Sequence, residues 1–280
     1  DDSIDSQDVS DNVADLIDAG QYDLEVSAGE TAPADTSDGA DGVATLSLDA
    51  RSTETLRMWT GSKSEIGTPS DLEDVNEALD NGEITQSSEV AVGDLAVHQL
   101  QASGFAGALE AQDNEDVTSR FKTELIDNGP LNLTIEEASP GANQDASELD
   151  LDYTGSNSNV TVIADGTNDT YYIVVNTGEL QFKSNSDRPD EQLPNDDDTA
   201  LETNFTVLQD DAGFDFTPDD QFDDDENSET FVEFNANEPE VTIDEPYNVS
   251  QASDQTVSGT TNIAPGTELS VRVRSQSGVT

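Results

Sequence analysis

The chain has 280 residues, of which 63 are acidic and only nine are basic, so its formal net charge is -54. A field this negative excludes nucleic acid as a partner. The absence of cysteine excludes disulfides, thiolate metal sites and cysteine nucleophiles. Apolar residues make up 32% of the chain, which is low but sufficient to fill sandwich cores.

The acidic residues are spread along the chain instead of forming one tail, which indicates a protein adapted to concentrated salt. The Debye length is roughly 8 Å at physiological ionic strength and roughly 3 Å at about 1 M salt, so concentrated salt screens the self-repulsion of such a chain. Intrinsic disorder is the alternative interpretation, because it also combines low hydrophobicity with high charge.

The first predicted element is a short helix over residues 10–20, with Ser10 as its N-cap and Gly20 just past its end. From Tyr22 the apolar residues follow a period of two, which predicts half-buried strands. These strands are expected at residues 22–26, 44–48, 56–59 and 90–100.

Two helical insertions are expected among the strands. Ser70 and Glu73 form a capping-box pattern at the start of a helix that ends at Asn81-Gly82. The second helix places Val117, Phe121 and Leu125 four residues apart and ends at Asn128-Gly129-Pro130.

Strand patterns then continue to the end of the chain. They cover residues 131–135, a hairpin of residues 159–164 and 170–176, and residues 204–208, 231–234 and 241–243. Many short strands separated by turn residues predict an all-β fold with a β-sandwich and short helical insertions.

The charge pattern predicts a domain boundary near Pro246. Residues 247–280 carry two acids and two bases, so the net charge of -54 lies entirely in residues 1–246. We expect residues 1–20 to be a linker or the end of a preceding domain, and residues 21–246 to be one decorated sandwich or two domains divided near residue 145. Residues 247–280 are expected to begin a further β domain, with a final amphipathic strand at 269–273, and both chain ends are expected to be cuts within a longer protein.

Five stretches carry a resemblance to a known family: GVATLSLDARST from Gly42, SDLEDV from Ser70, GDLAVHQLQASG from Gly93, PGANQD from Pro140 and VSGTTNIAPGTEL from Val257. In order and spacing they resemble the surface domains of haloarchaeal S-layer glycoproteins and related large cell-surface proteins. The resemblance implies immunoglobulin-like β-sandwich domains outside the cell. It also implies assembly with copies of the same protein into a two-dimensional lattice, and membrane attachment only through a C-terminal anchor that this chain lacks.

Three function classes remain open after this comparison. The first is a structural, non-enzymatic lattice protein, and the second is a cell-surface adhesin or binding module built from the same domains. The third is a halophilic hydrolase. Abundance separates the first two, because a lattice protein must dominate the envelope.

Five Asn-X-Ser/Thr sequons are candidate sites for N-linked glycans: Asn132, Asn159, Asn168, Asn204 and Asn248. Their number is close to what composition alone produces, so their placement is the stronger argument. Period-two alternation places Asn132, Asn159 and Asn204 on outward strand faces, and Asn168 is expected at a hairpin tip.

The acidic runs raise the possibility of a site for calcium or magnesium, which bind several carboxylate oxygens at once. The densest group consists of Asp219, Asp220, Asp223, Asp224 and Asp225. It does not follow the calcium-loop pattern, because the glycine at the sixth loop position is missing. Diffuse cation condensation is the simpler interpretation.

A hydrolase would have to rely on His98, the only histidine in the chain, or on one pair of its many acids. The strand pattern predicts His98 to be a packed or sheet-face residue, and no nucleophile-elbow sequence accompanies it. Trp59, the only tryptophan, is expected in the sandwich core.

Overall fold

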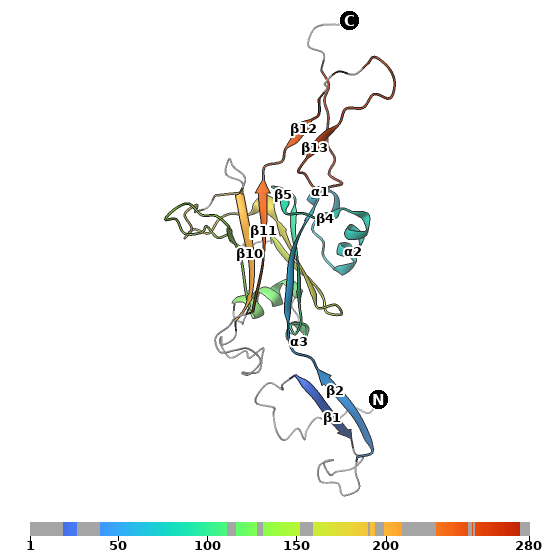
Figure 1. Cartoon of the computed structure of the whole chain (residues 1–280), viewed down its shortest axis with the longest axis vertical. Coiled ribbons are helices and arrows are strands. Elements are labelled where there is room, and N and C mark those ends of the chain that lie inside the picture. Colours follow the sequence, from blue (N-terminus) through green and yellow to red (C-terminus); the bar gives the residue numbers. More distant parts are fainter. Residues whose placement is uncertain are drawn as a thin grey trace.

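The body of the protein consists of two facing β-sheets, with a two-stranded hairpin at each end of the long axis (Figure 1). The computed structural model describes residues 19–26, 40–110, 116–127, 131–151, 159–189, 191–193, 199–208, 228–245, 248 and 250–274. The predicted all-β sandwich with short helical insertions is confirmed. The immunoglobulin-like detail stays a prediction.

The larger sheet has five antiparallel strands in the order β4-β3-β6-β9-β8. The strands are β3 (Thr53–Gly61), β4 (Ile84–Gln86), β6 (Leu95–Ala102), β8 (Val160–Asp165) and β9 (Thr170–Asn176). Every residue of β9 is buried, because both of its faces are covered. Tyr171 faces the core between the sheets, whereas Tyr172 faces a second apolar cluster on the outer side.

Helix α2 (Leu72–Asn81) supplies that outer layer, with Val75 and Ala78 buried in the second cluster. The sequence predicted Ser70 as the N-cap with Glu73 as its partner, and this is wrong by one residue. Asp71 caps the helix instead, and its carboxylate accepts a hydrogen bond from the Asp74 backbone N–H at 3.0 Å. An aspartate cap suits the positive end of the helix dipole. Gly82 ends the helix in the left-handed conformation at φ 73°, as expected.

The second predicted insertion forms two helical pieces. Helix α4 (Val117–Arg120) runs directly into η3 (Phe121–Asp127), a π-helical turn, and Phe121 is buried in the main core. The predicted stop at residues 128–130 lies outside the described residues. The other helical pieces are α1 (Lys63–Ile66), α3 (Ala106–Glu110) and the 3-10 turn η4 (Thr177–Glu179). Among the helices in the described ranges, none is long and apolar enough to cross a membrane.

The smaller sheet has the order β5-β11-β10-β7, antiparallel except for the parallel pair β11–β5. Its strands are β5 (Glu89–Ala91), β7 (Leu131–Glu137), β10 (Thr199–Val207) and β11 (Ser228–Asn237). Burial alternates strictly along β10, because one face of the strand packs on the core and the other faces solvent.

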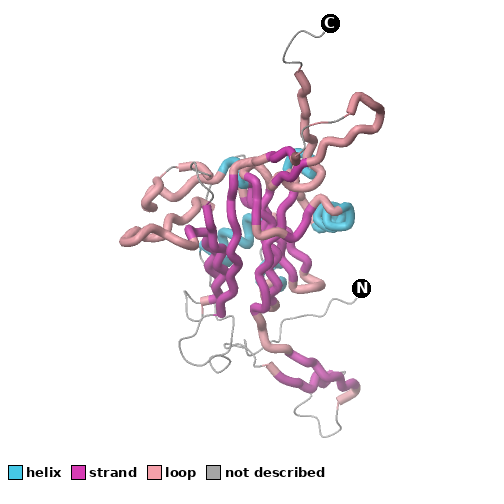
Figure 2. The backbone as a smooth tube through the Cα atoms, turned by 45° about the horizontal axis from the view of Figure 1, so that its top comes forward, coloured by secondary structure: helices cyan, strands magenta, loops and turns pink. Residues whose placement is uncertain are grey.

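The strands of the two sheets face one another (Figure 2). The main core lies between them and contains residues of both sheets. Its largest fully buried side chains include Phe105, Phe121, Tyr171 and Phe205. Strands from before and after residue 145 occur in both sheets. The domain boundaries proposed from the charge pattern stay predictions.

The strand expected over residues 90–100 is divided into β5 and β6, which belong to different sheets. The break occurs at Gly93, whose φ of 106° is strained for any residue with a side chain. The backbone of Gly93 also lies close to Gly178, where an added Cβ would meet the Gly93 Cα at 3.2 Å. Glycine therefore lets the chain cross from one sheet to the other at this point.

The terminal hairpins are β1 (Gly20–Val26) with β2 (Gly42–Leu48), and β12 (Val241–Ile243) with β13 (Gly259–Thr261). The sequence predicts that Gly20 lies just past the end of a helix, but Gly20 begins β1. Almost all of that predicted helix, residues 10–18, lies outside the described residues. The strand expected at residues 269–273 is also wrong, because this segment pairs with no described strand, and Val271 and Val273 are 81% and 91% exposed. An alternating pattern does not form a strand without a neighbour to accept its hydrogen bonds.

The C-terminal segment is fastened to the end of the sandwich by a short turn. The Ala264 backbone N–H donates to Oδ2 of Asp94 at 2.8 Å, and the Thr267 hydroxyl donates to Ser62 Oγ at 2.6 Å. Asp94 and Ala264 are only 7% and 3% exposed. Burial raises the pKa of Asp94, and the hydrogen bond from Ala264 partly opposes this rise.

We expect Asp94→Ala to loosen this attachment, because it leaves the buried Ala264 N–H without its acceptor. Losing this hydrogen bond to a charged group is expected to cost about 1.4 kcal/mol. That cost corresponds to a roughly tenfold rise in the population in which the segment is detached. Limited proteolysis within residues 250–274 measures that population. Asp94→Asn keeps a carbonyl acceptor and should be cleaved much more slowly than the alanine variant. Equal cleavage of the two variants would show that this hydrogen bond does not hold the segment.

Candidate functional site on the outward face of the four-stranded sheet

Strands β7, β10 and β11 present one solvent-facing surface, which we call the outward face. Directly opposed residues of antiparallel strands point to the same side, so the strand register arranges this face in rows. Across β11, β10 and β7 the rows are Glu229, Thr206 and Asn132; Phe231, Asn204 and Thr134; and Glu233, Glu202 and Glu136.

The third row continues to Glu148, which forms an isolated bridge with Glu136. We call Glu233, Glu202, Glu136 and Glu148 the glutamate row. Like charges directly opposite one another destabilise a sheet. The pKa of Glu136 is raised, first by burial and then by the negative charges of Glu148 and Glu202. Lys183 offsets part of this charge, since its Nζ lies 2.7 Å from Oε1 of Glu148.

The glutamate row has no geometry that identifies a specific metal site. In the described part of the chain, no group of three or more histidine, cysteine, aspartate or glutamate residues is placed to hold a metal ion. The carboxylates of the glutamate row therefore repel one another, and dissolved cations screen this repulsion.

We expect Glu202→Gln to raise the free energy of unfolding by about 0.5–1 kcal/mol at low salt, because it removes the charge at the centre of the row. The gain should shrink in molar salt, where the repulsion is already screened. Urea denaturation at two salt concentrations measures both values. Glu229→Gln is the matched control, since Glu229 lies on the same face opposite Thr206 and should change stability less. A gain for Glu202→Gln that is independent of salt would contradict the electrostatic explanation.

The structure places four of the five sequon asparagines where solvent reaches them, to different extents. Asn132 is exposed on β7, Asn204 is half-buried on β10, and Asn168 is exposed at the tip of the β8–β9 hairpin. Asn248 is exposed near the start of the C-terminal segment. Whether any of them carries a glycan stays a prediction.

The outward placement expected for Asn159 is wrong. Its side chain is 4% exposed, and its Nδ2 donates to the Glu179 carbonyl oxygen at 3.3 Å. The alternating pattern of β8 (Val160–Asp165) predicts an outward Asn159 only if the strand includes it. Asn159 instead precedes the strand and lies against η4. Period-two alternation accounts for the two faces of a sheet and not for loops that fold over its edge.

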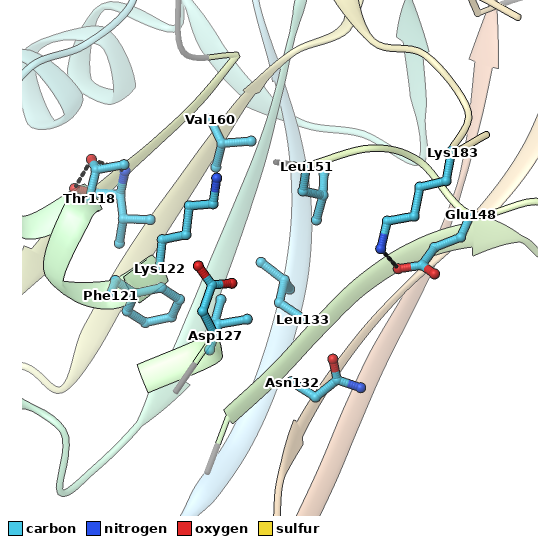
Figure 3. A pocket seen from close by; sticks show the side chains of 12 residues that line it. Thr118, Phe121, Lys122, Asp127, Asn132, Leu133, Glu148, Leu151, Val160 and Lys183 are labelled. Carbon is cyan, nitrogen blue, oxygen red and sulfur yellow. Dashed lines mark hydrogen bonds and ion pairs between the residues drawn. The ribbon is translucent and has the colours of Figure 1, made fainter. Parts of the chain in front are cut away.

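A pocket of about 140 Å³ lies at the side of the sandwich between β7, β8 and the α4–η3 insertion (Figure 3). Its walls are largely apolar and include Phe121, Leu133 and Val162. Thr118 connects helix α4 to β8 on one side of the pocket, because its hydroxyl accepts a hydrogen bond from the Val162 N–H at 2.9 Å. Asn132 also lines the pocket, so the sequon of β7 adjoins it.

The polar lining of this pocket includes Lys122 and Lys183, two of the three lysines in the chain. Two acids, Asp127 and Glu148, line the same pocket, and Figure 3 shows the ion pair between Lys183 and Glu148. The pocket thus balances its charges in a protein that is otherwise strongly negative. Its position was not predicted, because it depends on which strands form the sheet edges.

The aspartate group proposed for a divalent cation, Asp219, Asp220, Asp223, Asp224 and Asp225, lies outside the described residues. The proposal of calcium or magnesium there stays a prediction.

His98 lies in the core between the sheets and is fully buried, as the sequence predicted for a packed residue. Its Nε2 is 2.9 Å from the Thr203 hydroxyl, and its ring meets that of Phe234 edge-on at 5.5 Å. Burial lowers the pKa of His98 to about 4, which a backbone hydrogen bond with Ile173 partly opposes. Trp59 is partly buried and packs against the second cluster under α2, not in the core between the sheets.

Comparison with known proteins found extensive similarity to three haloarchaeal proteins. The chain is 37% identical over 283 residues to a cell surface glycoprotein of Haloferax gibbonsii, a match that covers 98% of the chain and 29% of that protein. It is 32% and 33% identical to cell surface glycoproteins 1 and 2 of Haloarcula hispanica, over 94% of the chain and 28% of each protein. The chain therefore spans less than a third of the length of these relatives.

The resemblance predicted from the five sequence stretches is confirmed by these matches. No family model matches the chain, and no solved structure is significantly similar to it.

Proposed function

We infer that the chain belongs to the haloarchaeal cell surface glycoproteins and forms a segment of such a protein on the outside of the cell. The observation that carries this conclusion is the similarity along nearly the whole chain to proteins with that name. The net charge of -54 supports it, because concentrated salt screens the self-repulsion of a chain with this charge.

Within that setting we propose a structural role, in which copies of the protein assemble side by side into a two-dimensional S-layer. The sandwich supplies a packed block, and its outward face carries the glutamate row. Two such faces can approach one another only if cations screen or bridge the carboxylates. Calcium and magnesium are the ions proposed for this task.

The role requires no catalytic residue. The neutral, fully buried His98 supports this view, because a buried imidazole bonded to Thr203 cannot reach a substrate. The second candidate is an adhesin or binding module, and the pocket lined by Lys122 and Lys183 is the observation that would favour it.

Electron microscopy of the full-length protein tests the structural role. The protein is released from cells by a chelator in high monovalent salt and then returned to calcium or magnesium. Ordered sheets that reappear with the divalent ion support the S-layer, and monovalent salt alone serves as the control. Dispersed molecules under every ion condition would favour the binding module, and layers that persist in chelator would contradict the role of divalent cations.

A further inference from the structure

Phe231 is an exception on the outward face. Among aromatic residues of the described ranges it is the only one classed as exposed, with 62% of its surface open to solvent. Its chain neighbours on the same face, Glu229 and Glu233, are both acidic. A single exposed apolar residue is common on protein surfaces, so its exposure alone identifies no function.

The register gives Phe231 a specific neighbour. Its cross-strand partner is Asn204, the asparagine of the sequon Asn204-Phe205-Thr206 (β10 and β11 in Figure 1). Directly opposed residues have Cβ atoms about 4.5–5.5 Å apart, so a group attached to Asn204 would rise from the sheet beside the Phe231 ring. On the other side of β11, the partner strand β5 pairs only with residues 235–237 and does not extend to Phe231.

The chemistry of a sugar matches this neighbour. A hexose ring has an apolar C–H face and a polar rim, and an aromatic ring presents the electron-rich face that such C–H groups contact. The exposed ring of Phe231 thus offers an apolar face beside the residue that would carry the first sugar, Asn204. The rim hydroxyls would remain accessible to water and to the surrounding carboxylates.

Among the described residues, three of the other four sequons have no exposed aromatic ring beside them. Asn132 lies opposite Thr206, Asn159 is buried, and Asn168 donates from Nδ2 to Oδ2 of Asp165 at 2.7 Å within its turn. Asn204 donates from Nδ2 to Oε1 of Glu202 at 2.9 Å. Glycosylation replaces one of the two Nδ2 hydrogens, so this hydrogen bond can persist through the other.

We propose that Asn204 carries an N-linked glycan whose first sugar packs on the ring of Phe231. This rests on the proposed identity as a cell surface glycoprotein. The sugar donor is an oligosaccharide linked through phosphate to a lipid, used by a separate transferase. The bond between sugar C1 and the phosphate oxygen breaks, a bond between C1 and Asn204 Nδ2 forms, and the displaced Nδ2 proton leaves with a base while the lipid phosphate departs.

The test uses the full-length protein made in a haloarchaeal host that glycosylates its own surface proteins. Glycopeptide mass spectrometry measures occupancy at each sequon, and hydroxyl-radical footprinting measures how strongly Phe231 is oxidised. In the unaltered protein we expect Asn204 to be occupied and Phe231 to be protected. Thr206→Val destroys the sequon without changing Asn204, and oxidation of Phe231 should then rise severalfold.

Two matched variants serve as controls. Thr206→Ser retains the sequon and should keep Phe231 protected. Asn132→Gln removes the other sequon of this face, one row away from Asn204, and should leave the oxidation of Phe231 unchanged.

The outcomes separate this inference from the proposed function. An unmodified Asn204 beside another occupied sequon overturns the inference and leaves the glycoprotein identity standing. If Phe231 is oxidised equally with and without the Asn204 glycan, the sugar does not pack on its ring. This result would overturn the inference both if the ring is always exposed to solvent and if a second copy of the protein covers it. If no sequon is occupied, both the glycoprotein identity and this inference fail. The proposed assembly into a lattice is tested separately, by electron microscopy.

Discussion

Phe205→Ala is expected to lower the free energy of unfolding by about 3–5 kcal/mol, the range for removing a large aromatic ring from a packed core. Phe205 is fully buried on the inner face of β10, and its ring lies 6.0 Å from that of Phe105, centroid to centroid. The loss combines the transfer free energy of the ring with the cavity that it leaves. Native proteins typically have a free energy of unfolding of about 5–15 kcal/mol, so this substitution removes a large part of the stability.

Urea denaturation in concentrated salt, followed by circular dichroism, measures the change. Phe231→Ala in protein made without glycosylation is the matched control, because it removes the same side chain from the adjacent strand at an exposed position. That variant should shift stability by less than about 0.5 kcal/mol. A similar loss for both variants would contradict the assignment of the two faces of the sheet.

The second large effect is acid destabilisation through His98. The unfolded chain binds a proton on this histidine with the ordinary pKa of 6.5, whereas burial holds the pKa in the folded protein at about 4. The unfolded state therefore binds more protons between these values, and stability must fall as the pH falls from 6.5 towards 4. Well above pH 6.5 both states are neutral at this site and the contribution is fully present.

The expected loss is about 2 kcal/mol between pH 7 and pH 5, and about 3 kcal/mol once the pH reaches 4. Most carboxylates with ordinary pKa values stay ionised above pH 5. Asp94 and Glu136 have raised pKa values, and they bind protons in the folded state as the pH falls, which opposes the loss of stability. His98 is the only histidine in the chain, so a variant at this position separates its contribution from theirs. Urea denaturation at fixed salt over this pH interval measures it.

His98→Gln removes the titrating group and keeps a polar partner for Thr203. We expect this variant to be less stable at pH 7, because the glutamine side chain fills the site less well. Its stability should change little between pH 7 and pH 5. A variant that loses as much stability as the parent protein over that interval would show that other groups cause the acid sensitivity.

Strand positions could be predicted from the sequence because they depend on local alternation. Residues 131–135 and the hairpin around Asn168 are examples, and both occur as expected. The errors arose where a neighbour in space decides the outcome. Asn159 is covered by η4, the chain changes sheets at Gly93, and residues 269–273 have no strand beside them among the described residues.

The same distinction applies to the candidate site. The sequons and the single acids Glu136, Glu202 and Glu233 are visible in the sequence, but of the three acids only Glu233 lies within a predicted strand. That they form one row, and that Asn204 faces Phe231, follows only from the register of β7, β10 and β11. A shift of one residue in that register would send every side chain of a strand to the other face.

The sequence by itself determined the salt-adapted character, the all-β class and the family resemblance, because charge and period-two alternation are properties of consecutive residues. The tertiary structure decided which residues from distant strands became neighbours. Among these are the contact of His98 with Thr203, the attachment of Ala264 to Asp94 and the pairing of Asn204 with Phe231. Such contacts are fixed by strand register and by the packing of segments that are distant in the chain, which no local pattern of residues encodes.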